Sequence, residues 1–242
     1  MTTRASALVF DIDDTLYDLA GPYRAAYAEL FAGRWDLPVD ELFLMSRVHS
    51  DEALDLLMAG KISAEDHKAL RAQWTFADWG VELSREEALA FQAAYAQAQE
   101  RIEPYPEAVE ALRVVREAGI PLGVISNGDG AHQRHKLALL GLDAFVGEKN
   151  VVVSGECGAN KPSPVPFREM ERRLGVSEGD IWYVGDTYET DIIGAKQAGW
   201  KALWVDVRGR EVPDVPERPD MVVHNPAEML QAIESLIPST KK

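Results

Sequence analysis

Short apolar runs recur along the chain and alternate with longer segments whose apolar residues are spaced as on one face of a helix. The runs are rich in Val, Ile and Leu and are flanked by Gly or polar residues, which is typical of strands buried in a parallel sheet. They predict strands at 7–10, 121–126, 151–153, 181–185, 202–206 and 221–223, with helical patterns between them at 106–119, 132–142 and 165–175. Strands and helices in alternation predict an α/β fold with a doubly wound, Rossmann-like parallel sheet.

One long segment, between the first strand and the helical pattern at 106–119, interrupts this alternation. It contains no convincing strand, but Ser63 and Ser84 each stand at the start of a helical pattern, and Glu87 completes a capping box with Ser84. Gly60 and Gly80 stand where helices would end.

We therefore expect two domains. The α/β core domain would comprise residues 1–15 and 101–242, and a helical cap domain, residues 16–100, would be inserted after the first strand. The aromatic residues of the cap are expected to form its own hydrophobic core; they are Trp74, Phe76, Trp79, Phe91 and Tyr95. The Pro-rich segment 208–220 is expected to be an exposed connector.

Charge and cysteine content narrow the choice of partners and compartment. The formal net charge of −15 over 242 residues argues against nucleic acid or an anionic membrane surface as a partner. The single cysteine, Cys157, excludes an internal disulfide framework and fits a reducing compartment. The sequence has neither the apolar stretch of a signal peptide nor that of a membrane span, so we expect a cytoplasmic protein, either a monomer or a homodimer.

Polar side chains follow several of the predicted strands. Ligands of open α/β sheets bind at the carboxyl ends of the strands, so residues at those ends are candidates for a shared site. In chain order the candidates are Asp11, Asp13 and Thr15 after the first strand, Ser126 and Asn127 after the second, Lys161 after the third, and Asp186 and Asp191 after the fourth.

Carboxylates gathered in this way repel one another, by about 4 kcal/mol for a pair 4 Å apart at an effective dielectric constant near 20. A cation offsets that repulsion, and Mg²⁺ prefers carboxylate oxygens together with substrate phosphate. Asp11, Asp13 and Asp186 are the candidate ligands of such an ion, and Lys161 would add a second positive charge. Ser126 and backbone N–H groups at the start of a helix can hold phosphate oxygens.

The order and spacing of these pieces resemble the haloacid dehalogenase superfamily, and more narrowly its phosphatases with a helical cap. The segment "DIDDTL" matches the first motif of that family, "SNG" the second, Lys161 in "KPSPVPF" the third and "GDTYETD" the fourth. The resemblance extends over essentially the whole chain.

The resemblance implies Mg²⁺-dependent hydrolysis of a phosphate ester through an aspartyl-phosphate. Asp11 would be the nucleophile, and Asp13 would protonate the leaving group and later activate water. The Asp11 carboxylate, the main-chain carbonyl of Asp13 and the Asp186 carboxylate would hold the metal, and Asp191 would support its outer shell or orient Lys161. The phosphate would be held, and its transition-state charge spread, by Thr15, Ser126, Asn127 and Lys161. Asp14 has no role in this scheme.

Other chemistries of the superfamily stay open from the sequence. Haloacid dehalogenases lack an aspartate at the position of Asp13, which favours a phosphatase; a phosphomutase, a phosphonate hydrolase or a catalytically retired binding protein are further alternatives. The expected partner is a small phosphorylated metabolite, such as a nucleoside monophosphate or a sugar phosphate. The cap would select it, with candidate contacts at Tyr17, Asp18, Tyr23, Arg47 and His49.

Overall fold

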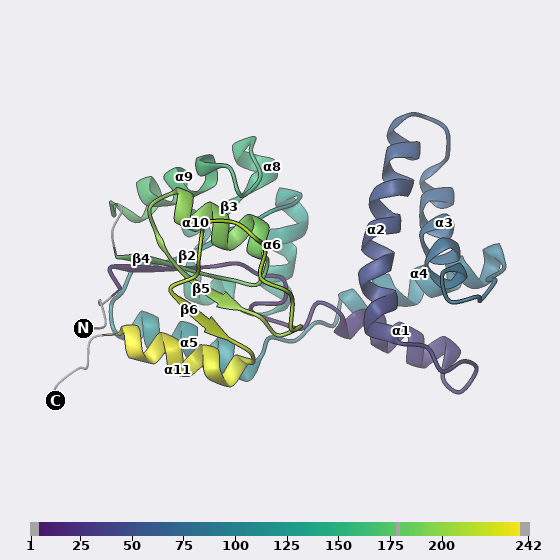
Figure 1. Cartoon of the computed structure of the whole chain (residues 1–242), viewed down its shortest axis with the longest axis horizontal. Helices are drawn as coiled ribbons and strands as arrows, with labels where there is room; N and C mark the ends of the chain where they lie inside the picture. Colours follow the sequence, from purple (N-terminus) through teal and green to yellow (C-terminus); the bar gives the residue numbers. More distant parts are fainter. Residues whose placement is uncertain (1–4, 178–179, 238–242) are drawn as a thin grey trace. The chain divides into compact units, whose positions relative to one another are not determined.

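The computed structural model describes residues 5–177 and 180–237, and the chain forms two compact units (Figure 1). Met1–Asp18 and Glu103–Lys242 make up the first unit, which we call the core unit. Leu19–Ile102 makes up the second, which we call the cap unit.

A six-stranded parallel sheet forms the centre of the core unit, which confirms the predicted fold class. Its order is β3-β2-β1-β4-β5-β6, so the chain starts in the middle of the sheet and builds outward in both directions. The strands are β1 (Ala7–Phe10), β2 (Leu122–Ser126), β3 (Val151–Val153), β4 (Ile181–Gly185), β5 (Lys201–Val205) and β6 (Met221–Val223). The four strands β1–β4 are fully buried, as their continuous apolar runs predict.

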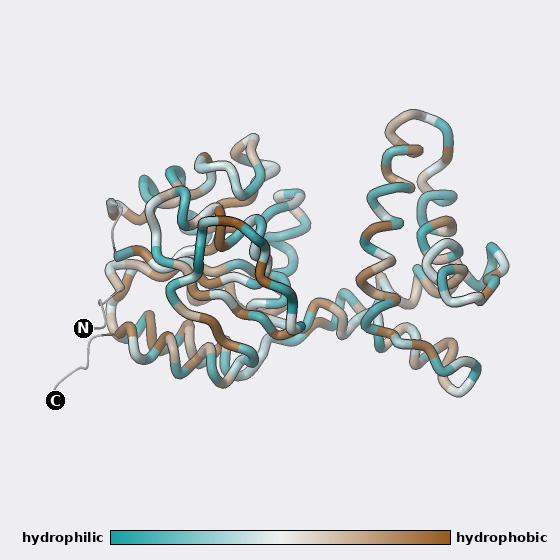
Figure 2. Tube along the Cα trace, in the orientation of Figure 1, coloured by the Kyte–Doolittle hydropathy of each residue, from teal (hydrophilic) through white to brown (hydrophobic). Residues whose placement is uncertain are grey.

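Helices cover both faces of the sheet. Figure 1 shows α9 and α10 on one face and α5 and α11 on the other, and Figure 2 shows hydrophobic residues on the strands and also on helices such as α11. Alternate strand residues such as Val9, Tyr183 and Trp204 pack with Phe167 of α9 in one apolar cluster. The helices are α5 (Pro106–Glu117), α6 (Gly130–Leu139), α7 (Asp143–Val146), α8 (Ser154–Cys157), α9 (Pro164–Leu174), α10 (Ile193–Gln197) and α11 (Pro226–Leu236).

The cap unit contains the helices α1 (Gly21–Phe31), α2 (Val39–Met58), α3 (Ala64–Ala77) and α4 (Arg85–Gln99). Ser63 and Ser84 cap α3 and α4, as the sequence predicts; the capping box of Ser84 with Glu87 was predicted, and Ser63 forms a second one with Asp66. The chain leaves α2 and α3 at Gly60 and Gly80, which adopt the left-handed conformation with φ of 68° and 72°.

Aromatic side chains fill the interior of the cap unit. Phe76, Phe91 and Tyr95 are buried there and Trp79 packs against them, as expected. Trp74 differs, because its ring contacts that of His49, 6.0 Å away between centroids, and not this cluster. Among the described residues, no helix is both long and apolar enough to cross a membrane.

Candidate active site

The topology brings the ends of β1 and β4 together. These strands are neighbours in the sheet at the point where its order reverses, which is where ligands of open α/β sheets bind. Asp11 follows β1 directly and Asp186 follows β4 directly. The Asp11 main-chain N–H donates to the carbonyl of Val184 at 2.9 Å, which extends the pairing of the two strands up to the first carboxylate.

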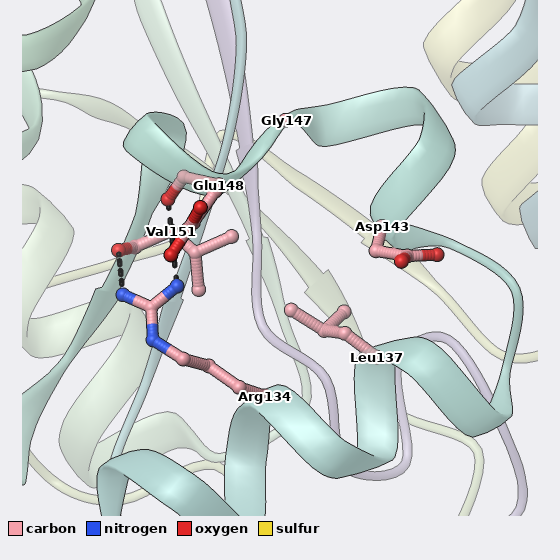
Figure 3. Close-up of a pocket in the computed structure, with 6 residues that line it drawn as sticks. All are labelled: Arg134, Leu137, Asp143, Gly147, Glu148 and Val151. Atoms are coloured by element: carbon pink, nitrogen blue, oxygen red, sulfur yellow. Dashed lines mark hydrogen bonds between the residues drawn. The ribbon is translucent and has the colours of Figure 1, made fainter.

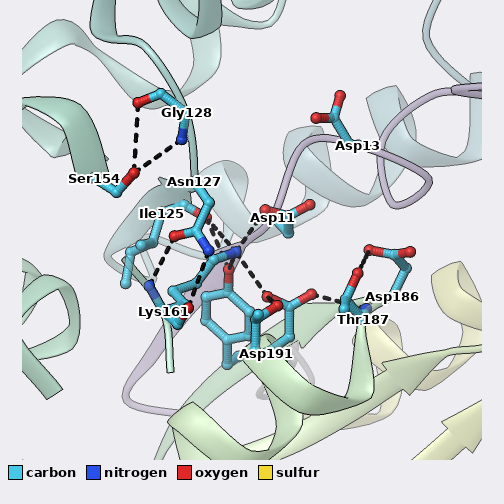
Figure 4. A network of polar contacts seen from close by, with 12 residues as sticks. Asp11, Asp13, Ile125, Asn127, Gly128, Ser154, Lys161, Asp186, Thr187 and Asp191 are labelled. Atoms are coloured by element: carbon cyan, nitrogen blue, oxygen red, sulfur yellow. Dashed lines mark hydrogen bonds and ion pairs between the residues drawn. The ribbon is translucent and has the colours of Figure 1, made fainter. Parts of the chain in front are cut away.

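Three aspartates gather at this point (Figure 4). Carboxylate oxygens of Asp11, Asp186 and Asp191 all lie within 4.8 Å of one another, and the three residues are 6%, 5% and 1% exposed. Gly185 makes the close approach of Asp191 possible, since a Cβ at that position would collide with the Asp191 carboxylate. Buried acids at such distances are stable only with nearby positive charge.

Lys161 supplies positive charge inside this cluster. Its Nζ atom donates to Asp11 Oδ1, Asp191 Oδ1 and the Tyr183 hydroxyl, each at 2.7 Å, and it lies 3.2 Å from the carbonyl oxygen of Ile125. Lys161 itself is 3% exposed. The predicted meeting of Asp11, Lys161 and Asp186 at one sheet edge is therefore present, with Tyr183 as an additional member that the sequence did not reveal.

The electrostatics of the cluster follow from this burial. Burial raises the pKa of Asp11 well above 3.8; Lys161 opposes this shift, and the charges of Asp191 and Asp186 add to it. Burial alone would lower the pKa of Lys161, but the carboxylates of Asp11 and Asp191 raise it well above 10.5. Burial and Asp191 raise the pKa of Asp186 to about 7, against the opposing charge of Arg210. When ionised, the three acids exceed Lys161 and Arg210 by one negative charge, which suits a bound cation.

Asp13 lies apart from the three clustered carboxylates and has its own partners. Lys136 of α6 donates to both Asp13 carboxylate oxygens, at 2.7 and 2.9 Å, and the Tyr17 hydroxyl donates to Oδ1 at 2.7 Å. The Asp13 side chain is 22% exposed. Lys136 and Tyr17 therefore orient the Asp13 side chain. The metal contact predicted for Asp13 involves its main-chain carbonyl, and this contact stays a prediction.

The candidate phosphate ligands differ in how their side chains are used. Thr15 is fully buried, and its Oγ1 atom has no hydrogen-bond partner among the described residues. Ser126 is buried at the end of β2. The Asn127 side chain accepts from the Lys161 main-chain N–H at 2.8 Å and donates to the Lys161 carbonyl at 3.1 Å. Asn127 thus fixes the loop of Lys161, and its contact with phosphate stays a prediction.

Two arginines reach the site from the segment 208–220, so the expectation of a plain connector was wrong. Arg208 donates to both carboxylate oxygens of Asp14, at 2.6 and 2.7 Å. Arg210 donates to Oδ2 and the carbonyl oxygen of Asp186, each at 2.8 Å. Asp14 adopts φ of 52°, the left-handed region that only a few non-glycine residues occupy, and the bidentate arginine holds it there.

Some of the site residues that were not predicted could have been found from their positions in the sequence. Arg208 and Arg210 follow the predicted fifth strand, so the argument from strand ends applies to them as it does to Asp186. Lys136 lies one helical turn after His132 in α6, and its long side chain reaches Asp13 only because the two segments, 123 residues apart, meet in the fold. Tyr23, a candidate cap contact, is fully buried in the cap core instead.

Comparison with known proteins agrees with this geometry. A family model described as haloacid dehalogenase-like hydrolase matches residues 5–199. The chain is 33% identical to glyceraldehyde 3-phosphate phosphatase of Methanopyrus kandleri, over 95% of this chain and 97% of that one. It is 38% identical to phosphoserine phosphatase of Thermus thermophilus, over 53% of this chain and 50% of that one.

Among solved structures, a dehalogenase with an intermediate complex aligns with a TM-score of 0.73 at 18% identity, covering 96% of this chain and 98% of that one. At that level of identity the likeness concerns the fold. The matched family and the first relative together establish that the chain belongs to the haloacid dehalogenase-like hydrolases, as the motifs predicted, and that it is an enzyme.

Proposed function

We propose that the protein is a Mg²⁺-dependent phosphatase that removes phosphate from a small phosphorylated metabolite through an aspartyl-phosphate on Asp11. The observation that carries this proposal is the buried triad of Asp11, Asp186 and Asp191 with Lys161 in direct contact with two of its members. The oxygen-only donor set of the triad fits a hard cation such as Mg²⁺. The relatives named above as phosphatases of small substrates support the same reading.

The proposed reaction has two steps, formation of the aspartyl-phosphate and its hydrolysis. A carboxylate oxygen of Asp11 attacks phosphorus, the bond to the leaving oxygen breaks, and Asp13 donates a proton to that oxygen. Asp13 then takes a proton from water, which attacks the phosphorus of the aspartyl-phosphate, releases inorganic phosphate and restores Asp11. Lys161 and the Thr15 hydroxyl stabilise the charge on the transferred group. Mg²⁺ at Asp11 and Asp186 would supply further neutralisation of that charge.

The second aspartate favours phosphate esters over haloacids. Displacement of halide from carbon needs no proton for the leaving group, whereas an alkoxide leaving from phosphorus does. The contacts that orient Asp13, with Lys136 and Tyr17, support this proton-transfer role for its carboxyl group. We infer that the substrate is a sugar phosphate or another small phosphate ester, with nucleoside monophosphates as a second class. Phosphate release from a panel of such esters in the presence of Mg²⁺ tests this; no turnover of any ester would contradict it.

Removal of the metal should abolish the activity of the enzyme. EDTA is expected to abolish turnover of p-nitrophenyl phosphate and Mg²⁺ to restore it, because the clustered carboxylates need a cation. Ca²⁺ serves as a control cation, since its longer bonds and higher ligand number suit the site less well. Full activity in EDTA, with chloride release from 2-chloropropionate, would point to dehalogenase chemistry instead.

The apparent affinity for Mg²⁺ should depend on pH with a defined sign. The pKa of Asp186 is raised to about 7 in the metal-free protein, so below that pH a proton must leave before the metal binds. We expect the affinity to fall on acidification below about pH 7, by about tenfold per pH unit for the proton on Asp186 and more steeply where the raised pKa of Asp11 adds a second proton. Mg²⁺ titrations of activity at several pH values check this; an affinity that rises on acidification would contradict it.

Lys136→Met should impair the hydrolysis of esters with poor leaving groups more than that of esters with good leaving groups. Loss of the lysine leaves the Asp13 carboxylate poorly oriented, so kcat/KM for an alkyl phosphate, which reports the step in which the leaving group departs, should fall about 10²-fold, at the low end of general acid–base contributions. The effect on p-nitrophenyl phosphate should be much smaller, because nitrophenolate leaves without a proton. Lys196→Met, which removes a lysine paired with Asp220 on the surface, is the matched control. An equal fall for both substrates would argue against this role of Lys136.

A further inference from the structure

Arg71, on α3 in the cap unit, is a cation without a counter-ion among the described residues. One guanidinium nitrogen donates to the side-chain oxygen of Gln92, and the guanidinium lies 5.6 Å from the centre of the Tyr95 ring. The Nε atom is buried and has no hydrogen-bond partner in the described part of the chain. Gln92, 5% exposed, also has an unpartnered Nε2 atom.

Several other arginines in the described part of the chain form ion pairs, which Arg71 does not. In the cap unit Arg24 pairs with Asp40, Arg34 with Glu87, and Arg85 with Glu65 and Asp66. In the core unit Arg134 borders a cavity of about 280 Å³ (Figure 3), and there it binds main-chain carbonyl oxygens and the Glu156 carboxylate. The charge of Arg134 is therefore paired at that cavity, whereas the charge of Arg71 has no such partner among the described residues.

A second arginine lies close to the first. Burial lowers the pKa of Arg71, and the charge of Arg47 on α2 lowers it further, while Tyr95 and Tyr23 partly oppose both effects. Arg47 forms no ion pair with any residue that the structure describes. The two guanidinium groups, on adjacent helices, repel each other. An anion between them would attract both and offset that repulsion.

A small pocket opens beside these arginines. Its volume is about 80 Å³, which suits a single carboxylate or phosphate group, and it is lined by Ser46, Arg47, Ser50, Asp51, Arg71 and Tyr95. The two arginines and the Ser50 hydroxyl are hydrogen-bond donors that an oxyanion can use, whereas the Ser46 hydroxyl already donates to the carbonyl oxygen of Phe43 at 2.7 Å. Asp51 is the one acid of this lining; it is exposed, and it pairs with neither arginine. Water could satisfy the unpartnered Nε–H of Arg71, but it could not neutralise the charge.

We propose that this pocket of the cap unit binds a small oxyanion, a carboxylate or a phosphate group, with Arg71 as its principal ligand and Arg47 as the second. The oxyanion is either a second acidic group of the substrate, which rests on the function proposed above, or a free anion that binds independently of turnover. Bidentate arginine contacts to such groups are among the stronger hydrogen bonds in proteins.

Binding can be measured by NMR on the intact 242-residue chain. The side-chain Nε–H signal of Arg71, assigned by its loss in Arg71→Lys, should shift in a saturable way on titration with sodium acetate or with inorganic phosphate. Arg47→Met, an exposed substitution, should weaken this binding about tenfold, as the loss of one charged donor implies. Arg85→Met, at an arginine paired on the cap surface, should leave it unchanged. No saturable shift with either probe, or equal affinity in both variants, would overturn the proposal.

Kinetics distinguish the two sources of the anion. 3-Phosphoglycerate carries a carboxylate where glycerol 3-phosphate carries a hydroxymethyl group. If the pocket binds the substrate, Arg47→Met should lower kcat/KM about tenfold for the first ester and leave the second nearly unchanged. If the NMR shift occurs while this ratio stays constant, the ligand is a free anion. Turnover of p-nitrophenyl phosphate reports on the core site alone, so failure of this proposal is separable from failure of the proposed function.

Discussion

Asp11→Asn should lower kcat for phosphate esters by at least about 10⁴-fold, as expected for the loss of a covalent nucleophile. The amide is nearly isosteric with the carboxylate, and Lys161 keeps its contact with Asp191, so the fold should persist. The replacement also removes one charge from a cluster in which Asp186 and Asp191 raise the pKa of Asp11. Thermal unfolding and circular dichroism should therefore resemble those of the wild type while turnover is lost.

A matched control separates the nucleophile from a general effect of lost negative charge. Asp143→Asn removes an exposed carboxylate of the same unit at the start of α7, and it should retain nearly full activity. Turnover of p-nitrophenyl phosphate by purified Asp11→Asn within about tenfold of the wild-type rate would contradict the assignment of Asp11 as the nucleophile.

Lys161→Met should impair both stability and activity. The substitution leaves the buried carboxylates of Asp11 and Asp191 without their cation, and breaking a buried ion pair from one side costs about 3–5 kcal/mol. In the metal-free protein we expect a loss of this order in the free energy of unfolding. Turnover should fall by at least about 10²-fold, because a donor that stabilises transition-state charge is lost.

The pH dependence of that stability loss has a defined sign. Lys161 opposes the raised pKa of Asp11, so without the lysine that pKa lies even further above its value in the unfolded chain. The folded state then binds more protons, so the variant loses stability as pH rises through the raised pKa of Asp11 and is closest to the wild type in acid. Urea unfolding in EDTA at acidic and neutral pH measures this. Lys201→Met, at an exposed pair with Asp220, should change stability by less than about 1 kcal/mol. A loss for Lys161→Met that is independent of pH would contradict this explanation.

Part of this architecture could be predicted because it depends on local rules. Continuous apolar runs gave the buried strands, and Ser84 with Glu87 gave the start of α4. The rule that parallel strands end at one edge of a sheet predicts that Asp11 and Asp186 lie together. The resemblance of the four motifs pointed to the family.

Other features could not be predicted because they depend on the reach of long side chains between distant segments. The contact of Lys136 with Asp13 and that of Arg208 with Asp14 join residues 123 and 194 positions apart. Tyr183 lies within β4, where an apolar run predicts only burial, and its hydroxyl accepts from Lys161. The unpaired state of Arg71 depends on which carboxylates are absent around it, and a sequence pattern carries no such information.

A structure determined with Mg²⁺ and beryllium fluoride tests the central claim most directly, because beryllium fluoride mimics the phosphoryl group of an aspartyl-phosphate. We predict beryllium bonded to a carboxylate oxygen of Asp11, Mg²⁺ held by Asp11 and Asp186, and the Lys161 ammonium within hydrogen-bond distance of a fluorine. Beryllium on another residue, or a Mg²⁺ ion bound away from Asp11 and Asp186, would contradict the account.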